Sequence, residues 1–370
     1  MSNTEQVFFA LLRSGLWELE IELLPYGPVD FDAIYKLAEE QSVIGLVGAA
    51  LEHITDGKPG KMQIRPFLTW VIAQEQRNSA MNEFIGWLWK RLHEEQIDSV
   101  LIKGQGIAQC YSRPNWRAAG DVDLLLDASN YERAKGVLCP LASSVEVEGI
   151  AAKHQGMTLG GFEVELHGTF RFGLSHRVDK VMSEIQDQVC SLEANRVWEN
   201  EGTGINLPSA DNDILIIFTH FLRHFYKGGI GLRQICDWCR LLWTYRDTID
   251  RSLLESRLRS CGLLSEWRAF AAFAVDTLGM PPDALPLYSS DRCWSRKGEI
   301  LRLFILKVGN FGHSRDNSYF SKYPYVIRKS ISAFQRLGDG LSHARIFPLD
   351  SVRFTFNAIL HGAQNAARGE

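Results

Sequence analysis

The chain has 370 residues, of which 45% are hydrophobic and 23% are charged, and its mean hydropathy is −0.12. This length is sufficient for two or three domains, each with a buried core of its own. The formal net charge of −4 disfavours a dedicated binder of nucleic acid or of anionic membranes, because such proteins usually carry a basic excess.

The N-terminal segment contains acidic and polar residues where a signal peptide would have a basic start and an apolar run. The longest apolar run, Ile214 to Phe218, is far too short to span a bilayer. The seven cysteines form an odd, irregularly spaced set, which is typical of reduced thiols. We therefore expect a cytoplasmic protein with no membrane partner. Cys236 and Cys239 have redox spacing, but they fall within an amphipathic helical pattern and are interpreted as packing residues.

Residues 1–96 are predicted to be helical throughout. Apolar residues recur at helical spacing from Phe8 to Leu16, Asp30 is placed to cap the next helix, and a short helix covers Val43 to Leu51. A long helix is predicted from Pro66 to Glu95. Its expected core stripe is Ile72, Met81, Phe84, Ile85, Leu88 and Leu92. This region is interpreted as a scaffold.

Residues 97–205 change character, because short strands here alternate with helices. Strands are predicted at Ser99 to Ile102, Asp121 to Leu126 and Phe162 to His167, and a helix at Ser129 to Leu138. The last of these strands alternates cleanly. Its apolar side chains face one way and Glu163, Glu165 and His167 face the other.

Residues 206–370 return to helical patterns and complete a three-part division into 1–96, 97–205 and 206–370. The first helix of this part is predicted to run from about Ala210 to Phe225 with Asp211 or Asn212 as its cap. Further helices are expected at Gly231–Tyr245, Ser252–Cys261, Leu264–Leu278, Glu299–Val308, Tyr325–Leu337 and Ser351–Ala367.

Two aspartates, Asp121 and Asp123, stand one residue apart on a predicted strand and therefore point the same way. Two carboxylates aimed at one point repel each other, and a divalent cation relieves that repulsion. Oxygen ligands on a rigid support suit Mg²⁺ or Mn²⁺ rather than zinc. Glu165, on a strand expected beside them, is the candidate third ligand.

A lysine and glycine turn, Lys103 to Gly106, lies between a strand and a helix. Glycine there allows backbone amides to approach an anion, and lysine adds a point charge, so the turn is a candidate phosphate site. Glycines at such turns also serve geometry alone. His220 and His224, one helical turn apart, are interpreted as core or cleft-lining residues, with a shared zinc ion as the alternative.

The order of these features resembles the nucleotidyltransferases of the DNA polymerase β type, and more closely the family known as uncharacterised nucleotidyltransferases. The resemblance rests on Lys103 and Gly104 at the turn, Arg117 in the following loop, and the strand from Asp121 to Leu126. The later acid and histidine of the family appear as Glu165 and His167. Its helical signature appears as His220 and His224 followed by Leu232, Arg233 and Asp237.

The resemblance implies an α+β fold in which a small mixed-sheet core is flanked by N-terminal and C-terminal helical regions. It implies that Asp121, Asp123 and Glu165 bind Mg²⁺ or Mn²⁺ and carry catalysis. Lys103, Gly104, Gln105, Arg117 and His167 would contact the nucleotide. The broader superfamily has a serine where this chain has Gln105. The third acid is a glutamate, one methylene longer than the usual aspartate.

The implied activity is transfer of a nucleoside monophosphate from an NTP to a hydroxyl of a small molecule, a sugar or polysaccharide precursor, or a protein. The alternative is a non-catalytic nucleotide-binding or interaction module that retains the fold. The charge disfavours a nucleic-acid acceptor, and the sequence leaves the acceptor, the preferred NTP and the oligomeric state open.

Overall fold

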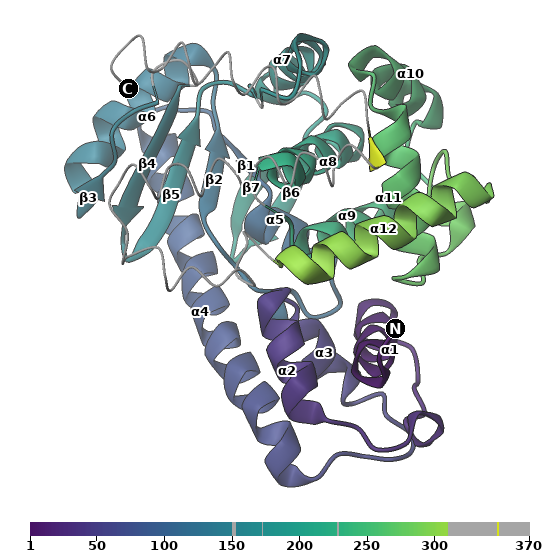
Figure 1. Ribbon diagram of the computed structural model, residues 1–370. Coiled ribbons are helices and arrows are strands. Elements are labelled where there is room, and N and C mark those ends of the chain that lie inside the picture. Colours follow the sequence, from purple (N-terminus) through teal and green to yellow (C-terminus); the bar gives the residue numbers. More distant parts are fainter. Residues whose placement is uncertain (150–152, 172, 228, 310–345, 348–370) are drawn as a thin grey trace, which may run out of the picture.

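A mixed sheet, with strand order β1-β2-β5-β4-β3, carries the middle of the chain (Figure 1). The computed structural model describes residues 1–149, 153–171, 173–227, 229–309 and 346–347. The strands are β1 (Val100–Ile102), β2 (Val122–Leu125), β3 (Ser144–Val145), β4 (His154–Leu159) and β5 (Phe162–His167). Of the pairings between these described strands, only that of β2 with β5 is parallel. Helices flank the sheet, so the predicted α+β class is confirmed.

The two faces of β2 are both buried, because the sheet is covered on each side. Val122 and Leu124 pack in one cluster with helix α4 (Lys61–Glu94) and helix α6 (Ala128–Leu138). Leu125, on the other face, joins the larger cluster formed by the helical regions. Asp123 also points to that second side by the alternation of the strand. Asp121 lies just before β2 and Leu126 just after it, so the observed strand is shorter than the predicted one at both ends.

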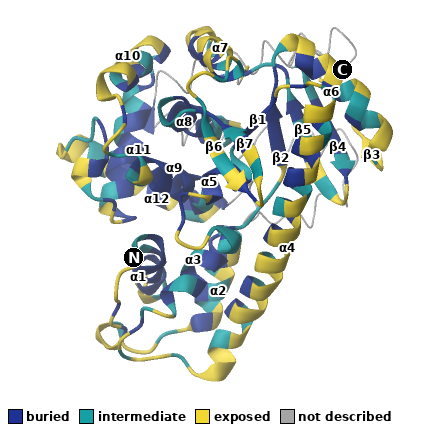
Figure 2. Ribbon diagram, turned by 180° about the vertical axis from the view of Figure 1, so that it is seen from behind, coloured by how far each residue is buried: buried dark blue, intermediate teal, exposed yellow. Residues whose placement is uncertain are grey.

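The N-terminal region forms α1 (Asn3–Trp17), α2 (Phe31–Glu40), α3 (Ile44–Ala50) and α4. Asp30 caps α2 as predicted, because its carboxylate accepts a hydrogen bond of 3.0 Å from the Ala33 amide. Helix α4 begins at Lys61 and contains Pro66 in its interior, so the predicted start was wrong. Ile72, assigned to the core stripe, is 55% exposed and lies on the outward face of α4, which Figure 2 shows exposed along its length.

The described part of the C-terminal region, which ends at residue 309 apart from residues 346–347, is mainly helical, as predicted. It comprises α8 (Ala210–Lys227), α9 (Leu232–Thr244), α10 (Arg251–Cys261), α11 (Leu264–Asp276) and α12 (Arg292–Val308). Ser209 caps α8, in place of the predicted Asp211 or Asn212, because its hydroxyl accepts from the Asn212 amide at 3.4 Å. The predicted helices Tyr325–Leu337 and Ser351–Ala367 lie outside the described residues.

Several elements of the middle region were not anticipated. They are β3, β4, helix α7 (His176–Cys190) and a separate hairpin of β6 (Arg196–Asn200) and β7 (Thr203–Leu207). The short helix expected after the lysine and glycine turn is present as α5 (Gly104–Ala108), which already begins within that turn. The β4–β5 turn consists of Gly160 and Gly161, with φ of 59° and 84°, values that favour glycine. This two-residue turn fixes the register of the hairpin, and that register matters for the site.

The terminal helical regions pack against each other around one large hydrophobic cluster, to which α1, α2 and α3 contribute together with α8, α9 and α11. The Trp17 indole donates to the Leu278 carbonyl at 2.6 Å, and Arg240 donates to the Leu16 carbonyl at 2.8 Å. Cys236 and Cys239 are buried within this cluster, and burial raises the pKa of both thiols, in agreement with a packing role. None of the described helices is both long and apolar enough to cross a bilayer.

Candidate active site

Asp123 and Glu165 lie side by side on adjacent strands. β2 and β5 run parallel, and their register places Asp123 directly opposite Glu165. Neighbouring strands are about 4.8 Å apart, so the two side chains leave the sheet as close neighbours. Asp121 precedes Asp123 by two positions and lies at the entrance to β2. The three predicted carboxylates therefore come from two adjacent strands.

The Asp123 carboxylate is buried, with 6% of the residue exposed, and two basic side chains compensate its charge. Lys103 Nζ lies 2.7 Å from Asp123 Oδ1, and His167 Nε2 lies 2.8 Å from the same oxygen. Burial raises the pKa of Asp123, but the charge of Lys103 and the hydrogen bond to His167 outweigh it, so the pKa is lowered overall. The ionised form is therefore favoured.

The pKa of Asp121 is shifted in the opposite direction to that of Asp123 and is raised. Its partial burial raises its pKa, and the negative charges of Asp123 and Glu165 raise it further, while Lys103 acts in the lowering direction. Like charges that crowd one another in this way are relieved by a cation. Asp121 is therefore close enough to Asp123 and Glu165 for their negative charges to act on its pKa.

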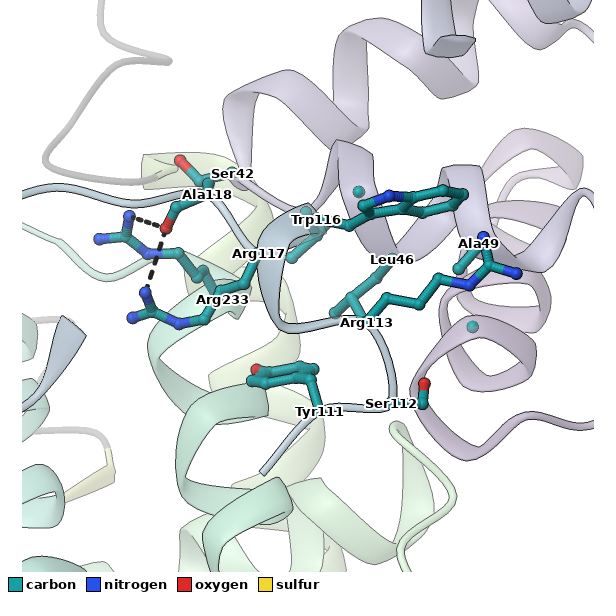
Figure 3. A pocket seen from close by; sticks show the side chains of 13 residues that line it. Ser42, Leu46, Ala49, Tyr111, Ser112, Arg113, Trp116, Arg117, Ala118 and Arg233 are labelled. Atoms are coloured by element: carbon teal, nitrogen blue, oxygen red, sulfur yellow. Dashed lines mark hydrogen bonds between the residues drawn. The ribbon is translucent and has the colours of Figure 1, made fainter. Parts of the chain in front are cut away.

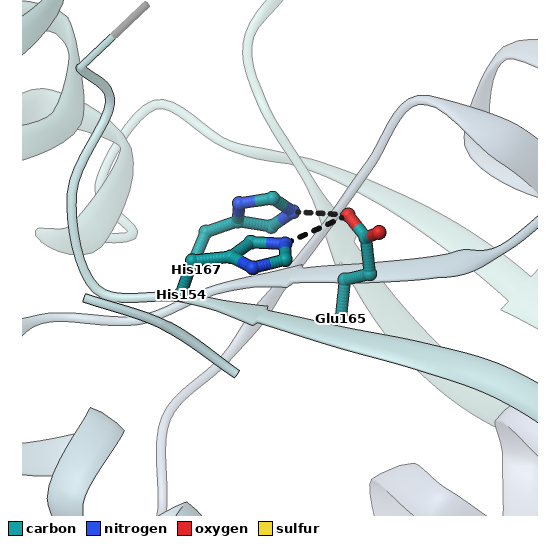
Figure 4. A group of neighbouring side chains, drawn as sticks. All are labelled: His154, Glu165 and His167. Atoms are coloured by element: carbon teal, nitrogen blue, oxygen red, sulfur yellow. Dashed lines mark ion pairs between the residues drawn. The ribbon is translucent and has the colours of Figure 1, made fainter. Parts of the chain in front are cut away.

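Two neighbouring histidines contact the same oxygen of Glu165 from one side (Figure 4). Its Oε2 atom lies 3.1 Å from His154 Nε2 and 3.4 Å from His167 Nε2. Hydrogen bonds from His154 and His167 lower the pKa of Glu165, and the contact with Glu165 raises the pKa of His154. Potential ligand atoms of these three residues all lie within 4.8 Å of one another, and among the described residues no other such group of three was found.

His154 is a site residue that the sequence prediction missed. It lies at the start of β4, opposite His167 at the end of β5. A signal for it existed in the sequence. Two adjacent glycines between alternating segments indicate a two-residue hairpin turn. Pairing Leu159 with Phe162 across that turn places His154 opposite His167.

The predicted phosphate turn is conformationally unusual. Lys103 has φ 60° and ψ −145°, close to a region that is almost confined to glycine, and Gly104 has φ 40°. A Cβ atom on Gly104 would lie 3.3 Å from the Asp121 carbonyl oxygen. Helix α5, which begins at Gly104, has only five residues, so its dipole adds little to anion binding. If the turn binds an anion, as predicted, its backbone amides and Lys103 are the groups available for that contact.

Gln105 and Arg117 are engaged away from the carboxylates. The Gln105 side chain is buried and donates to Asn82 Oδ1 on α4 at 2.7 Å. Arg117 forms a two-pronged ion pair with Asp237 of α9, with N–O distances of 2.7 and 2.8 Å. Figure 3 shows Arg117 and Arg233 converging on the Ala118 carbonyl. Nucleotide contacts by Gln105 and Arg117 stay predictions.

Helix α8 faces the carboxylates from the C-terminal region. Arg223 is close enough for Glu165 to act on its pKa, and burial together with the charge of Lys103 lowers the pKa of His220. Burial lowers the pKa of His224 to about 4, and its Nε2 lies 3.1 Å from that of His220. Within the described residues, no third metal-ligating side chain joins these two histidines. The arrangement agrees with a cleft-lining role.

The fold and the cluster together define the class. This is an α+β protein whose small mixed sheet carries paired carboxylates beside a lysine and glycine turn. A sequence model of the family described as "Uncharacterised nucleotidyltransferase" matches residues 27–279. The match covers more than half of the chain, so the chain belongs to this family, and the resemblance noted from the motifs is confirmed. Comparison with curated proteins finds no match, and comparison with solved structures finds none either.

Proposed function

We propose that this protein transfers a nucleoside monophosphate from an NTP to a hydroxyl group, with Mg²⁺ or Mn²⁺ as cofactor and pyrophosphate as the second product. One observation carries the proposal: Asp123 and Glu165 are register partners on adjacent parallel strands, with Asp121 two positions away. The family membership of the chain supports the same reaction type. The acceptor we propose is a small molecule, a sugar or polysaccharide precursor, or a protein side chain.

The donor set suits a divalent cation. Three carboxylates from two strands offer oxygen ligands on rigid backbone, which is the chemistry that Mg²⁺ and Mn²⁺ prefer. Asp121 and Asp123 would hold both ions, and Glu165 would bind the ion on the acceptor side. When bound, such ions neutralise the triphosphate and lower the pKa of the attacking hydroxyl.

The remaining residues of the proposed site would bind the phosphates of the nucleotide and orient them. Lys103, which contacts Asp123, has a flexible stem that allows its ammonium group to turn to a phosphate, and Gly104 leaves its backbone amide open to close approach. Arg223 of α8 and Arg233 of α9 are basic groups near the carboxylates, because Glu165 acts on the pKa of Arg223 and Asp121 acts on that of Arg233. Arg233 Nε is buried and has no hydrogen-bond partner among the described residues, which leaves a donor for an anion.

In the proposed reaction the acceptor oxygen bonds to the α-phosphorus as the bond from that phosphorus to the bridging oxygen breaks. Pyrophosphate leaves with the electron pair of that bond, and the hydroxyl proton passes to the Glu165 carboxylate. His154 and His167, both in contact with Glu165, orient that carboxylate. Catalysis in such a site comes from positioning and charge stabilisation.

Titration of each NTP with Mg²⁺, followed by a screen for pyrophosphate release with hydroxyl acceptors, tests the proposal. We expect Asp123→Asn to reduce turnover by about 100- to 1,000-fold, the range typical for loss of one electrostatic group in a preorganised site. Asp98→Asn is the matched control, because Asp98 is an exposed carboxylate just before β1 and the charge change is the same. Equal activity of both variants and the wild type would contradict the proposal.

A second candidate is a non-catalytic nucleotide-binding or interaction module. A specific observation favours it: Lys103 and His167 already compensate the charge of Asp123 without a metal ion. Such a protein would bind an NTP, or a partner, without releasing pyrophosphate from any acceptor mixture. The same titration and screen therefore separate the two functions.

A further inference from the structure

The cluster of His154, Glu165 and His167 differs chemically from the aspartate pair beside it (Figure 4). We propose that these three side chains hold one first-row transition ion of the Mn²⁺, Co²⁺ or Zn²⁺ class. The site would lie where β4 begins and β5 ends. The binding claim stands on its own, whereas the assignment of this ion to the acceptor side of the reaction rests on the proposed function.

The spacing of the donor atoms fits a shared ion. Donor atoms about 2.1 Å from one ion, at tetrahedral or octahedral angles, are separated by roughly 3.0–3.4 Å. Glu165 Oε2 lies 3.1 Å from His154 Nε2 and 3.4 Å from His167 Nε2. Two of the three separations therefore fit one ion, and the ligand atoms of the two histidines lie within 4.8 Å of each other.

The backbone holds the three residues in place. His154 and His167 are directly opposite each other in the β4–β5 hairpin, and Glu165 lies on the same face of β5 as His167. Sites on strands are positioned more rigidly than sites on loops. Their side chains are 33%, 15% and 32% exposed for His154, His167 and Glu165, so an ion can enter while most bulk water is excluded.

The ligand types decide which ion is bound. Two imidazole nitrogens and one carboxylate favour Mn²⁺, Co²⁺ or Zn²⁺, whereas Mg²⁺ prefers oxygen ligands only. Asp123 Oδ1 lies 2.8 Å from His167 Nε2, the same nitrogen that faces Glu165, so a bound ion would take the place of this contact and Asp123 would be available as a further oxygen ligand. Asp121 and Asp123 therefore offer only oxygen ligands, whereas the two histidines beside Glu165 add nitrogen ligands.

The test is a titration of the purified chain with Co²⁺, followed by visible absorption, and a competition with Zn²⁺, both without nucleotide. The wild type is expected to bind one Co²⁺ per chain at this site. His154→Gln should weaken binding by at least about 100-fold, because loss of even an outer partner of a metal ligand costs ~10–100-fold. His93→Gln, an exposed histidine in the last turn of α4, is the matched control and should bind as the wild type does.

A second variant guards against a folding defect in the first. His154→Cys replaces the imidazole with a thiolate ligand, so it should retain Co²⁺ and add a sulfur-to-cobalt charge-transfer band to the spectrum. Failure of the wild type to take up Co²⁺ or Zn²⁺ would overturn the inference. Binding that His154→Gln leaves unchanged, or a His154→Cys spectrum without the new band, would overturn it as well.

The outcome is separable from that of the proposed function. Binding of Co²⁺ that depends on His154, in a chain that binds no NTP, would support the metal site and count against the transferase. Binding of NTP and Mg²⁺ that depends on Asp123, with Co²⁺ uptake unaffected by His154→Gln, would support the transferase and overturn the metal site.

Discussion

At the scale of single residues, the ion pair between Arg117 and Asp237 connects the loop before β2 to α9. Both side chains are buried, at 7% and 6% exposure, and the Tyr111 hydroxyl donates to the same carboxylate at 2.8 Å. Because removing one partner leaves the other charge buried and uncompensated, such pairs are costly to break. The pair therefore fixes the geometry of the loop that leads into Asp121.

We expect Asp237→Ala to lower the free energy of unfolding by about 3–5 kcal/mol. Asp247→Ala is the control, because Asp247 lies 3.6 Å from Arg246 in a largely exposed pair, and its loss should cost less than about 1 kcal/mol. Urea unfolding of the wild type and both variants measures the difference. Equal midpoints for the two variants would show that the buried pair does not contribute as argued.

Asp213 gives a prediction for pH. Burial raises the pKa of Asp213 to about 6, although the Arg196 ion pair acts to lower it. The unfolded chain releases this proton near pH 4, so between about pH 4 and 6 the native state binds more protons than the unfolded state. Native stability associated with Asp213 is therefore present below pH 4 and is lost as the pH rises through 6.

The variant Asp213→Asn has no such proton to release. The stability of the wild type relative to the variant should fall from pH 4 to pH 6 and then level off. Urea midpoints of both proteins at several pH values measure this difference. A difference that stays constant across the interval would contradict the assigned titration.

At the scale of elements, the turn between β1 and α5 depends on glycine at one position. Gly104 has φ 40°, and a Cβ atom there would lie 3.3 Å from the Asp121 carbonyl. Gly136, exposed in the last turn of α6, has an ordinary conformation, and a Cβ atom added to it would have no neighbour within 4 Å. Alanine substitutions at Gly104 and Gly136 can therefore be compared directly, with Gly136 as the control position.

Gly104→Ala should destabilise the protein by about 1–2 kcal/mol, because a left-handed conformation costs this much for residues with a Cβ atom. On the proposed function it should also weaken NTP binding. Gly136→Ala should stabilise the protein by up to about 1 kcal/mol, since alanine is the better helix former. Thermal unfolding and NTP titration of both variants test this, and a neutral Gly104→Ala would show that the turn tolerates a side chain.

At the scale of the whole molecule, packing does not follow the boundaries predicted from sequence. Met81, Ile85 and Leu88 of α4 lie in one cluster with Val122 and Leu124 of the sheet, across the boundary at residue 96. The other face of the sheet joins the cluster of the helical regions through residues such as Leu125. The division into 1–96, 97–205 and 206–370 stays a prediction, and these contacts cross its boundary at residue 96.

We expect the fragment 97–205 to lack a cooperative unfolding transition, because it loses α4 from one face of the sheet and the terminal helical regions from the other. The fragment 61–207, which restores α4 and β7, should resist higher urea concentrations than the shorter one. Circular dichroism of both fragments and of the intact chain measures this. A cooperative transition in the shorter fragment, equal to that of the intact chain, would support the three-part division instead.

The sequence by itself determined β2 and β5, the two strands that carry Asp123 and Glu165. Alternation predicted β5 with the bounds observed, and placed Glu165 and His167 on one face. The cap at Asp30 also followed from a local pattern, whereas the α+β class was implied by the family resemblance of the motifs. The strands and the cap depend on residues only a few positions apart, so that short-range periodicity and side-chain chemistry are enough to predict them.

Only the tertiary structure decided which side chains meet. His154 joins Glu165 because the hairpin register brings β4 beside β5, and Gln105 turns to Asn82 rather than to the carboxylates. Arg117 finds Asp237, 120 positions away, although the motif had suggested a phosphate contact. Partners so distant in sequence are chosen by burial and by the packing of whole elements, and local patterns do not encode those choices.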